Sequence, residues 1–277
     1  MDALRRPSHL LFDFFGTLVD YSPSRTEQGY PRSHALLREF GAALDYAGFL
    51  SAWSATTARF DRETAADERE FSVDEVAAAF LAEALPAAPT GSQVAGFVAA
   101  YLAEWGSAIR PFEGVAELLR ELSGRCRLAV VSNTHSPTMV PDLLARLGVL
   151  ELMDAVVLSV DTGHRKPHPS IYRTALERLG LSPADAWFIG DSAGPDYHGP
   201  RRAGIPALLV DPAGTADVPP AHRIRSVHAL PALLAALPAG RPPGRSPRPG
   251  ARPRRAAGGD AAAGRAGGTG LTRGQLR

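Results

Sequence analysis

The chain comprises 277 residues, 45% hydrophobic and 21% charged, which is enough to bury one full-sized core and a smaller second lobe. Its single Cys126 excludes an intrachain disulfide framework. No run of about 18 apolar residues and no signal-peptide-like start is present, so we expect a cytoplasmic protein with no membrane partner. The net charge of +1 is the sum of +8 in residues 239–277 and −7 in residues 1–238. Because residues 1–238 are acidic, we expect no specific nucleic-acid partner.

The first expected element is a buried strand within Leu10–Phe14, where an apolar run carries a single carboxylate, Asp13. Residues 21–110 follow, and there strand-like runs give way to helical patterns. We expect helices within Ser33–Gly48, Phe49–Thr64, Val73–Leu85 and Gln93–Trp105. This helical insertion interrupts the sheet, and Pro111 marks the return. We expect the aromatic residues of this insertion to form the core of a helical bundle, and the alternative is that they line a substrate pocket. They are Trp53, Phe60, Phe80, Phe97 and Trp105.

Between residues 112 and 210, short apolar runs alternate with amphipathic stretches, which is typical of parallel βαβ units. The runs are Leu128–Val131, Ala155–Leu158, Trp187–Ile189 and Ala207–Val210. Right-handed crossovers would join them to Leu10–Phe14 in an α/β fold, a Rossmann-like parallel sheet with helices on both faces. The expected domains are an α/β core at 1–20 and 111–238, a helical domain at 21–110, and a disordered tail rich in Arg, Pro, Gly and Ala at 239–277.

Side chains suited to catalysis stand at the ends of these expected strands. Asp13, Ser132 and Asp191 each follow an apolar run, and Lys166 lies in the loop after Ala155–Leu158. Because the carboxyl ends of parallel strands meet at one edge of a sheet, we expect these groups to converge there. An ionised carboxylate with a nearby cation is what attack on an anionic phosphorus centre requires.

The segments around these residues are Phe-Asp-Phe-Phe-Gly-Thr, Val-Val-Ser-Asn-Thr, Arg-Lys-Pro and Phe-Ile-Gly-Asp-Ser. Together they resemble the four-motif signature of the haloacid dehalogenase-like hydrolases over residues 8–238. The resemblance implies that the helical insertion is a cap domain. It implies Asp13 as catalytic nucleophile with Lys166 as its catalytic cation, and a small-molecule phosphate held by Ser132, Asn133 and Thr17.

The resemblance also implies a Mg²⁺ cofactor, which suits hard carboxylate oxygens. Its protein ligands would be Asp13, Asp191 and the backbone carbonyl of Phe15, and Asp196 would orient Lys166 or a metal-bound water. The histidines, His135 among them, lack metal-ligand spacing and are interpreted as loop or surface residues.

One position departs from the pattern of the family's phosphatases, which carry an acid two residues after the nucleophile where this chain has Phe15. A general acid contributes about 10²–10⁴-fold by protonating the leaving oxygen. The sequence therefore predicts Mg²⁺-dependent, phosphatase-type hydrolysis of a small-molecule phosphate that has a good leaving group.

Two alternatives stay open. An aromatic residue at this position resembles the 2-haloacid dehalogenases, which attack carbon without a metal, although Gly190-Asp191 is of the metal-binding type. A non-catalytic protein that binds phosphate or a partner is the other. The sequence leaves the physiological substrate and the oligomeric state open.

Overall fold

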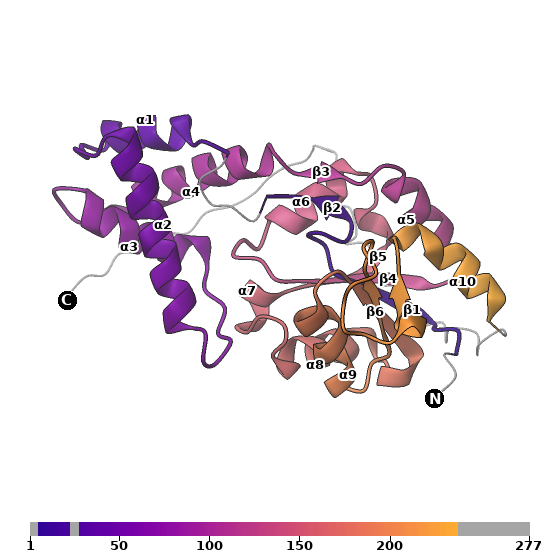
Figure 1. The fold of residues 1–277 in the computed structure, drawn as a ribbon. Coiled ribbons are helices and arrows are strands. Elements are labelled where there is room, and N and C mark those ends of the chain that lie inside the picture. Colours follow the sequence, from indigo (N-terminus) through magenta and orange to yellow (C-terminus); the bar gives the residue numbers. More distant parts are fainter. Residues whose placement is uncertain (1–4, 23–27, 238–277) are drawn as a thin grey trace, which may run out of the picture. The chain divides into compact units, whose positions relative to one another are not determined.

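The computed structural model describes residues 5–22 and 28–237, so the tail expected to be disordered lies outside the described residues. Six strands form one sheet in which every pairing is parallel, in the order β5-β4-β1-β6-β7-β8. The strands are β1 (His9–Phe12), β4 (Arg127–Ser132), β5 (Met153–Leu158), β6 (Ala186–Gly190), β7 (Ala207–Val210) and β8 (Arg223–Ile224). The predicted α/β class is confirmed (Figure 1).

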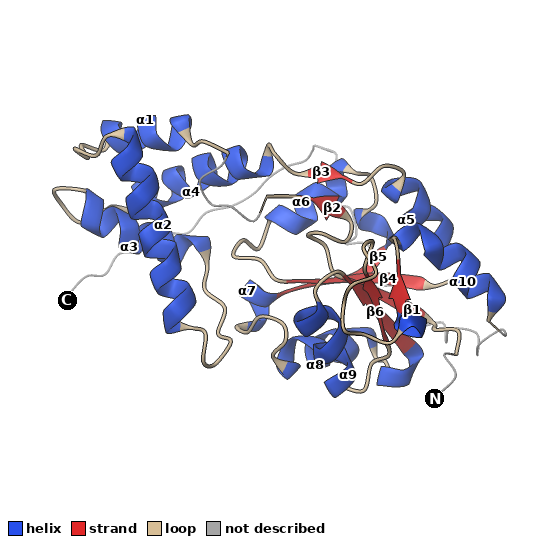
Figure 2. Ribbon diagram, viewed as in Figure 1, coloured by secondary structure: helices blue, strands red, loops and turns tan. Residues whose placement is uncertain are grey.

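Helices cover both faces of this sheet, as Figure 2 shows. Leu10 and Phe12 of β1 join a buried cluster with α5 (Val115–Ser123), α6 (Met139–Arg146) and α10 (Leu230–Ala236). Leu11 points to the other face, where the cluster includes residues of α8 (Pro169–Leu179). Burial on both faces explains why the central strands read as continuous apolar runs. Two short helices complete this region, α7 (Ser159–Thr162) and α9 (Gly199–Arg202).

The helical segment leaves and re-enters the α/β region through two paired strands. β2 (Val19–Asp20) pairs antiparallel with β3 (Arg110–Pro111), next to the predicted return at Pro111. Between them lie α1 (Pro31–Glu39), α2 (Tyr46–Glu63), α3 (Val73–Ala84) and α4 (Gly91–Gly106). The helix expected over Ser33–Gly48 is divided, because Gly41 adopts a φ of +96° and Asp45 caps the next helix.

A buried carboxylate ties the first and last of these helices together. Glu104 of α4 accepts hydrogen bonds from the backbone N–H groups of Arg32 and Ser33 and from the Ser33 hydroxyl. Tyr30, the residue at the N-cap of α1, offers no side-chain cap, so Glu104 satisfies donors that helix starts leave unpaired. In the described part of the chain, no helix combines the length and apolar character needed to cross a membrane.

Candidate functional site

The candidate site forms where the strand order reverses direction. β1 lies between β4 and β6, so the chain crosses to one side of β1 first and to the other side later. The loops at the carboxyl ends diverge at such a point and leave a crevice. Asp13 is the first residue beyond β1, and its backbone N–H donates to the carbonyl of Ile189 at 2.8 Å. The sheet therefore fixes the backbone of Asp13 at the entrance of the crevice.

The side chain of Lys166 joins two carboxylates in this crevice. Its Nζ donates to Asp13 Oδ1 at 2.6 Å and to Asp196 Oδ1 at 2.7 Å. All three side chains are buried, and the second oxygen of Asp196 accepts from the backbone N–H of Ser192. Removal from water strengthens these charge-assisted bonds and makes each partner depend on the others.

Burial raises the pKa of Asp13 to about 7, with Asp196 and Asp191 adding to the effect and the Lys166 ammonium opposing it. For Lys166, burial acts to lower the pKa, but the charges of Asp13 and Asp196 outweigh it and the pKa is raised. Lys166 is therefore an ammonium at neutral pH. Asp13 is a carboxyl group whose charge depends on how much positive charge surrounds it.

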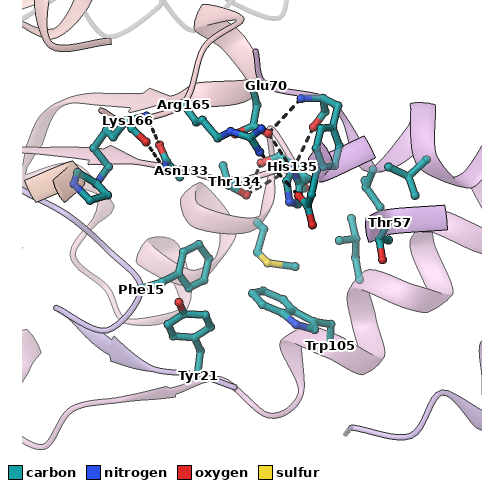
Figure 3. Close-up of a pocket in the computed structure, with 18 of the residues that line it drawn as sticks. Phe15, Tyr21, Thr57, Glu70, Trp105, Asn133, Thr134, His135, Arg165 and Lys166 are labelled. Carbon is teal, nitrogen blue, oxygen red and sulfur yellow. Dashed lines mark hydrogen bonds and ion pairs between the residues drawn. The ribbon is translucent and has the colours of Figure 1, made fainter. Parts of the chain in front are cut away.

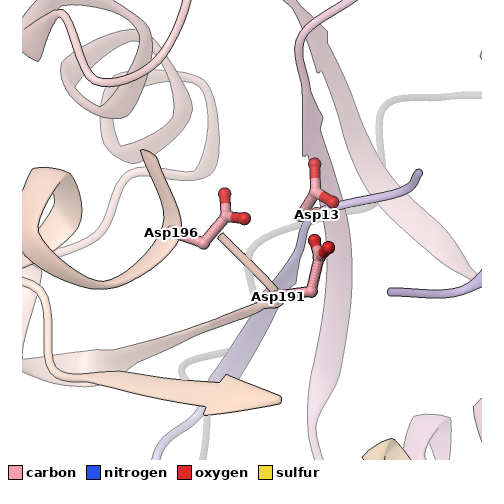
Figure 4. A group of neighbouring side chains, drawn as sticks. All are labelled: Asp13, Asp191 and Asp196. Atoms are coloured by element: carbon pink, nitrogen blue, oxygen red, sulfur yellow. The ribbon is translucent and has the colours of Figure 1, made fainter. Parts of the chain in front are cut away.

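A third carboxylate completes the cluster drawn in Figure 4. Ligand atoms from Asp13, Asp191 and Asp196 all lie within 4.8 Å of one another. The side chain of Asp191 is open to solvent, whereas the other two are buried. The hydroxyl of Thr17 lies 3.1 Å from Asp13 Oδ2 and 3.3 Å from Asp191 Oδ1, so it can donate to either carboxylate. Thr17 thus contacts the carboxylates.

Two glycines allow this close approach. A Cβ placed on Gly16 would lie 2.5 Å from Asp191 Oδ2, and Gly16 also adopts a φ of +83°. A Cβ on Gly190 would lie 2.4 Å from the Cβ of Asp196. Both glycines of the sequence motifs are therefore required by the packing of a carboxylate against the backbone.

Ser132 and Asn133 at the end of β4 form hydrogen bonds within the protein, and Asn133 also lines the cavity beside Asp13. Asn133 Nδ2 donates to the carbonyl of Lys166, and its Oδ1 accepts from the N–H of Lys166. This pair of bonds fixes the loop that carries the ammonium. The Ser132 hydroxyl is fully buried and donates to the carbonyl of Asn133 at 3.3 Å.

Phe15 belongs to an aromatic group that also includes Tyr21 and Trp105. Its ring centroid lies 5.3 Å from that of Tyr21 and 5.5 Å from that of Trp105. Burial raises the pKa of the Tyr21 hydroxyl, and the charge of Asp191 adds to that effect. An aromatic side chain at position 15 thus links the first motif to helix α4 of the helical segment.

A cavity of about 380 Å³ opens beside Asp13. Its walls come from the α/β region, which contributes Asp13 and Lys166, and from the helical segment, which contributes Trp53 and Trp105. Figure 3 shows polar side chains such as His135 on one side and the Phe15 ring on the other. The expectation of a bundle core holds for Phe80 and Phe97, which are buried, whereas the two tryptophans also line the cavity.

Sequence reasoning missed Glu70, which lies in the loop between α2 and α3. Its buried carboxylate accepts from the hydroxyl of Ser159 and the N–H of Phe71, and lies 2.9 Å from His135 Nδ1. The His135 ring stacks on Phe71 at 4.4 Å, so the interpretation of His135 as an ordinary loop or surface histidine is incomplete.

Backbone bonds reinforce this junction between the helical segment and the α/β region. The N–H of Glu70 donates to Gly163, that of Val73 to His135, and that of Arg165 to Glu68. No local sequence pattern identifies Glu70, because the partners of its carboxylate, apart from its neighbour Phe71, lie at least 65 positions away.

A family model described as haloacid dehalogenase-like hydrolase matches residues 7–204. The chain belongs to the haloacid dehalogenase-like hydrolases. The family assignment confirms the resemblance identified from the four motifs and makes the protein a hydrolase by family.

Curated relatives in this family match different shares of the chain. The human haloacid dehalogenase-like hydrolase domain-containing protein 3 is 37% identical over 129 residues, 44% of this chain and 51% of that protein. The chain thus spans about half the length of this relative. A Cupriavidus necator protein named phosphoglycolate phosphatase is 31% identical over 235 residues, 81% of this chain and 92% of that protein.

Solved structures support the fold assignment. A 2-haloacid dehalogenase from Pseudomonas syringae superposes with a TM-score of 0.65 at 21% identity, covering 83% of this chain and 98% of that one. A HAD phosphatase from Thermococcus onnurineus gives a TM-score of 0.56 at 22% identity, covering 83% and 99%. Enzymes named for two different reactions share this haloacid dehalogenase-like fold, so the chemistry must be argued from the site.

Proposed function

We propose that this protein is a Mg²⁺-dependent phosphatase that hydrolyses a small-molecule phosphate through Asp13. The observation that carries the proposal is the cluster of Asp13, Asp191 and Asp196, in which Asp13 and Asp196 share the ammonium of Lys166. When ionised, three carboxylates exceed one ammonium by two negative charges, and a divalent cation would balance them. The Cupriavidus necator relative named phosphoglycolate phosphatase supports the same reaction class.

The donor set fits Mg²⁺, since Asp13 and Asp191 offer hard carboxylate oxygens close to one another. We propose the backbone carbonyl of Phe15 as the third protein ligand. A carbonyl is a ligand whatever the side chain, so Phe15 does not remove this donor. The cation would supply positive charge that favours the ionised form of Asp13 and attracts the phosphate oxygens.

The residues then act in two steps. A carboxylate oxygen of Asp13 attacks phosphorus, the bond from phosphorus to the leaving oxygen breaks, and an aspartyl-phosphate forms. Water next attacks this phosphorus, which releases inorganic phosphate and restores the Asp13 carboxylate. Lys166 offsets negative charge beside Asp13 in both steps, while Asp196 holds the ammonium in place and Asn133 holds its backbone.

Phe15 carries no proton for the leaving oxygen, so that oxygen departs as an anion or takes its proton from solvent. We infer that the natural substrate has a leaving group of low pKa. We also propose that residues 21–110 act as a cap, with 1–20 and 111–238 as the core, because the cavity is lined from both parts.

The test is phosphate release from 4-nitrophenyl phosphate with Mg²⁺ or with a chelator. Turnover should require Mg²⁺ and should be lost in Asp13→Asn and Asp191→Asn. Asp161→Asn is the matched control, since Asp161 is exposed on α7 and lies outside the carboxylate cluster. Metal-independent turnover, or turnover that survives Asp13→Asn, would contradict the proposal.

A 2-haloacid dehalogenase is the second candidate, and the aromatic side chain of Phe15 favours it. Halide release from L-2-chloropropionate by a metal-free preparation, without phosphatase activity, would establish that chemistry instead. Phosphate binding with turnover of neither substrate type would favour a non-catalytic binding protein.

A further inference from the structure

His135 lines the cavity beside Asp13, and the protein fixes the position of one of its ring protons. Its Nδ1 lies 2.9 Å from Glu70 Oε1 and 3.1 Å from the carbonyl oxygen of Phe71, in the group of side chains drawn in Figure 3. Both neighbours are hydrogen-bond acceptors, so Nδ1 carries a proton. In the neutral ring the free lone pair is therefore on Nε2.

The Nε2 atom of His135 is accessible. Its side chain is 36% exposed, and among the described residues Nε2 has no hydrogen-bond partner. In the same part of the chain, the buried side-chain nitrogen and oxygen atoms that lack a partner belong to His9 and Trp53 and not to His135. Since imidazole exchanges protons between about pH 5 and about pH 8, this nitrogen can take a proton from water in the cavity.

Glu70 is a rigid partner for the ring. Its side chain is 1% exposed, and its carboxylate also accepts from the N–H of Phe71 and the hydroxyl of Ser159. That hydroxyl accepts from the N–H of Thr134, which leaves its own proton for Glu70. The His135 ring also stacks on Phe71. The carboxylate thus holds the ring in one orientation and offsets the positive charge that forms when Nε2 takes a proton.

The second step of the proposed reaction needs such a proton acceptor. A phosphoryl group on Asp13 would lie in the cavity, because Asp13 lines it. The attacking and leaving oxygens stand roughly in line at phosphorus, so water enters from the side that the leaving group has vacated. Water that bonds to phosphorus must lose a proton, and the phenyl ring of Phe15 cannot accept it.

Other groups that line the cavity are less suited to this task. A general base works best when its own pKa lies near the working pH, and near neutrality imidazole meets this condition better than a carboxylate. The carboxylates among the described lining residues also contact a hydrogen-bond donor or a cation of the protein. They are Asp13, Asp61, Glu70, Asp191 and Asp196.

We propose that His135 is the general base of the second step and that Glu70 is its positioning residue. The proposal rests on the proposed phosphatase function and assigns a proton transfer that Phe15 cannot perform. Nε2 takes a proton from the attacking water as the water oxygen bonds to phosphorus. The bond from phosphorus to Asp13 breaks, and its electron pair returns to the carboxylate. Solvent then takes the proton from Nε2, which restores the neutral ring.

The test measures how fast phosphorylated Asp13 decays. The protein is mixed with Mg²⁺ and radiolabelled 4-nitrophenyl phosphate, chased with unlabelled substrate and quenched in acid at intervals. His135→Asn retains an N–H donor for Glu70 but has no imidazole Nε2, and it should slow the decay by about 10²-fold or more.

Steady-state rates give a second readout of the same variant. The kcat of His135→Asn should fall to one value for 4-nitrophenyl and 2,4-dinitrophenyl phosphate, because both substrates form the same phosphorylated Asp13. Its kcat/KM should stay nearly unchanged, since that ratio reports the first step. The first turnover should then appear as a burst of nitrophenol.

His34→Asn is the matched control. His34 is also half-buried and stacked on a phenylalanine, Phe49, but it does not line the cavity, so decay should match that of the unmodified protein. Glu70→Gln keeps an acceptor for Nδ1 but removes the charge, and it should slow decay by a smaller factor than His135→Asn. If His135→Asn fails to fold, His135→Gln is measured in its place.

The outcomes separate the two proposals. If the unmodified protein neither phosphorylates Asp13 nor releases phosphate, the phosphatase proposal itself is wrong. If turnover requires Asp13 and Mg²⁺ but decay is as fast in His135→Asn as in the unmodified protein, the phosphatase proposal stands and His135 is not the base. Equal slowing in His34→Asn would also overturn the role of His135, because general loosening of the helical segment would then explain the effect.

Discussion

The Nζ atom of Lys166 lies 2.6 Å from Asp13 Oδ1, although 153 positions separate the two residues in the chain. Lys166 is also the only lysine among the 30 Lys and Arg residues of the sequence. A compact ammonium can lie between two carboxylates, whereas a planar guanidinium presents a wider fork. The contact therefore explains why this position carries lysine, although every other Lys or Arg position of the chain is arginine.

Replacing Lys166 should be strongly damaging. Lys166→Met leaves Asp13 and Asp196 buried without their shared cation, and we expect unfolding in urea to show a loss of about 3–5 kcal/mol. Lys166→Arg should also lose activity, because it keeps the charge but not the shape. Full phosphatase activity in Lys166→Arg would show that charge alone is enough and that the close fit has no role.

Introducing an acid at position 15 should widen the range of substrates. Phe15→Asp supplies a proton donor, and Phe15→Asn is its control because both lose the contacts with Tyr21 and Trp105. On an alkyl phosphate, kcat should be about 10²-fold higher in the Asp variant than in the Asn variant. On 4-nitrophenyl phosphate the two should differ little. Equal rates on the alkyl phosphate would mean that position 15 does not reach the leaving oxygen.

Magnesium should stabilise the folded protein. A ligand at 100 times its Kd that binds only the folded state adds about 2.7 kcal/mol, which should raise Tm by several degrees. Thermal unfolding with Mg²⁺ and with a chelator measures this shift. Asp191→Asn should abolish it and Asp161→Asn should retain it; a shift of equal size in both variants would place the metal elsewhere.

His9 on β1 should make stability fall in mild acid. It is 4% exposed and its Nε2 has no partner in the described structure, and burial, aided by the charge of Arg127, lowers its pKa below the ordinary 6.5. Below that ordinary value the unfolded chain binds the proton and the folded one resists it, so stability declines by at most about 1.4 kcal/mol per pH unit.

His9→Leu removes the titrating imidazole and puts an apolar side chain in its place. Urea unfolding between about pH 7.5 and about pH 5.5 should show a smaller loss of stability in the variant than in the unmodified protein. Parallel pH profiles for the two proteins would show that His9 titrates alike in the folded and unfolded states.

Glu70 should stabilise the junction between the helical segment and the α/β region. Glu70→Ala leaves the N–H of Phe71 without its acceptor and removes one hydrogen-bond partner each from Ser159 and His135. We expect a loss of about 1–3 kcal/mol. Glu70→Gln keeps one carbonyl acceptor and should lose less. Hydrogen exchange should accelerate mainly in residues 69–73 and 134–136, and a uniform acceleration would argue against a local role.

Much of the fold could be predicted from local patterns. The alternation of apolar runs with amphipathic stretches predicts a parallel sheet, because right-handed crossovers leave few other arrangements of βαβ units. Asp13 and Asp191 could be assigned to one edge of the sheet for the same reason, since each follows a buried strand. The division of the helix expected over Ser33–Gly48 was missed, because the turn at Gly41 depends on a backbone conformation that a periodic pattern does not report.

The amino-acid sequence by itself determined the fold class, the four motifs and the edge of the sheet where they meet. Alternating apolar and amphipathic stretches indicate parallel βαβ units, and the carboxyl ends of parallel strands lie at one edge of a sheet. Only the tertiary structure decided which partner each side chain takes. Asn133 bonds the backbone of Lys166, Glu70 contacts His135, and Thr17 lies between Asp13 and Asp191. These contacts join residues distant in the chain, so they depend on how the helical segment packs against the sheet.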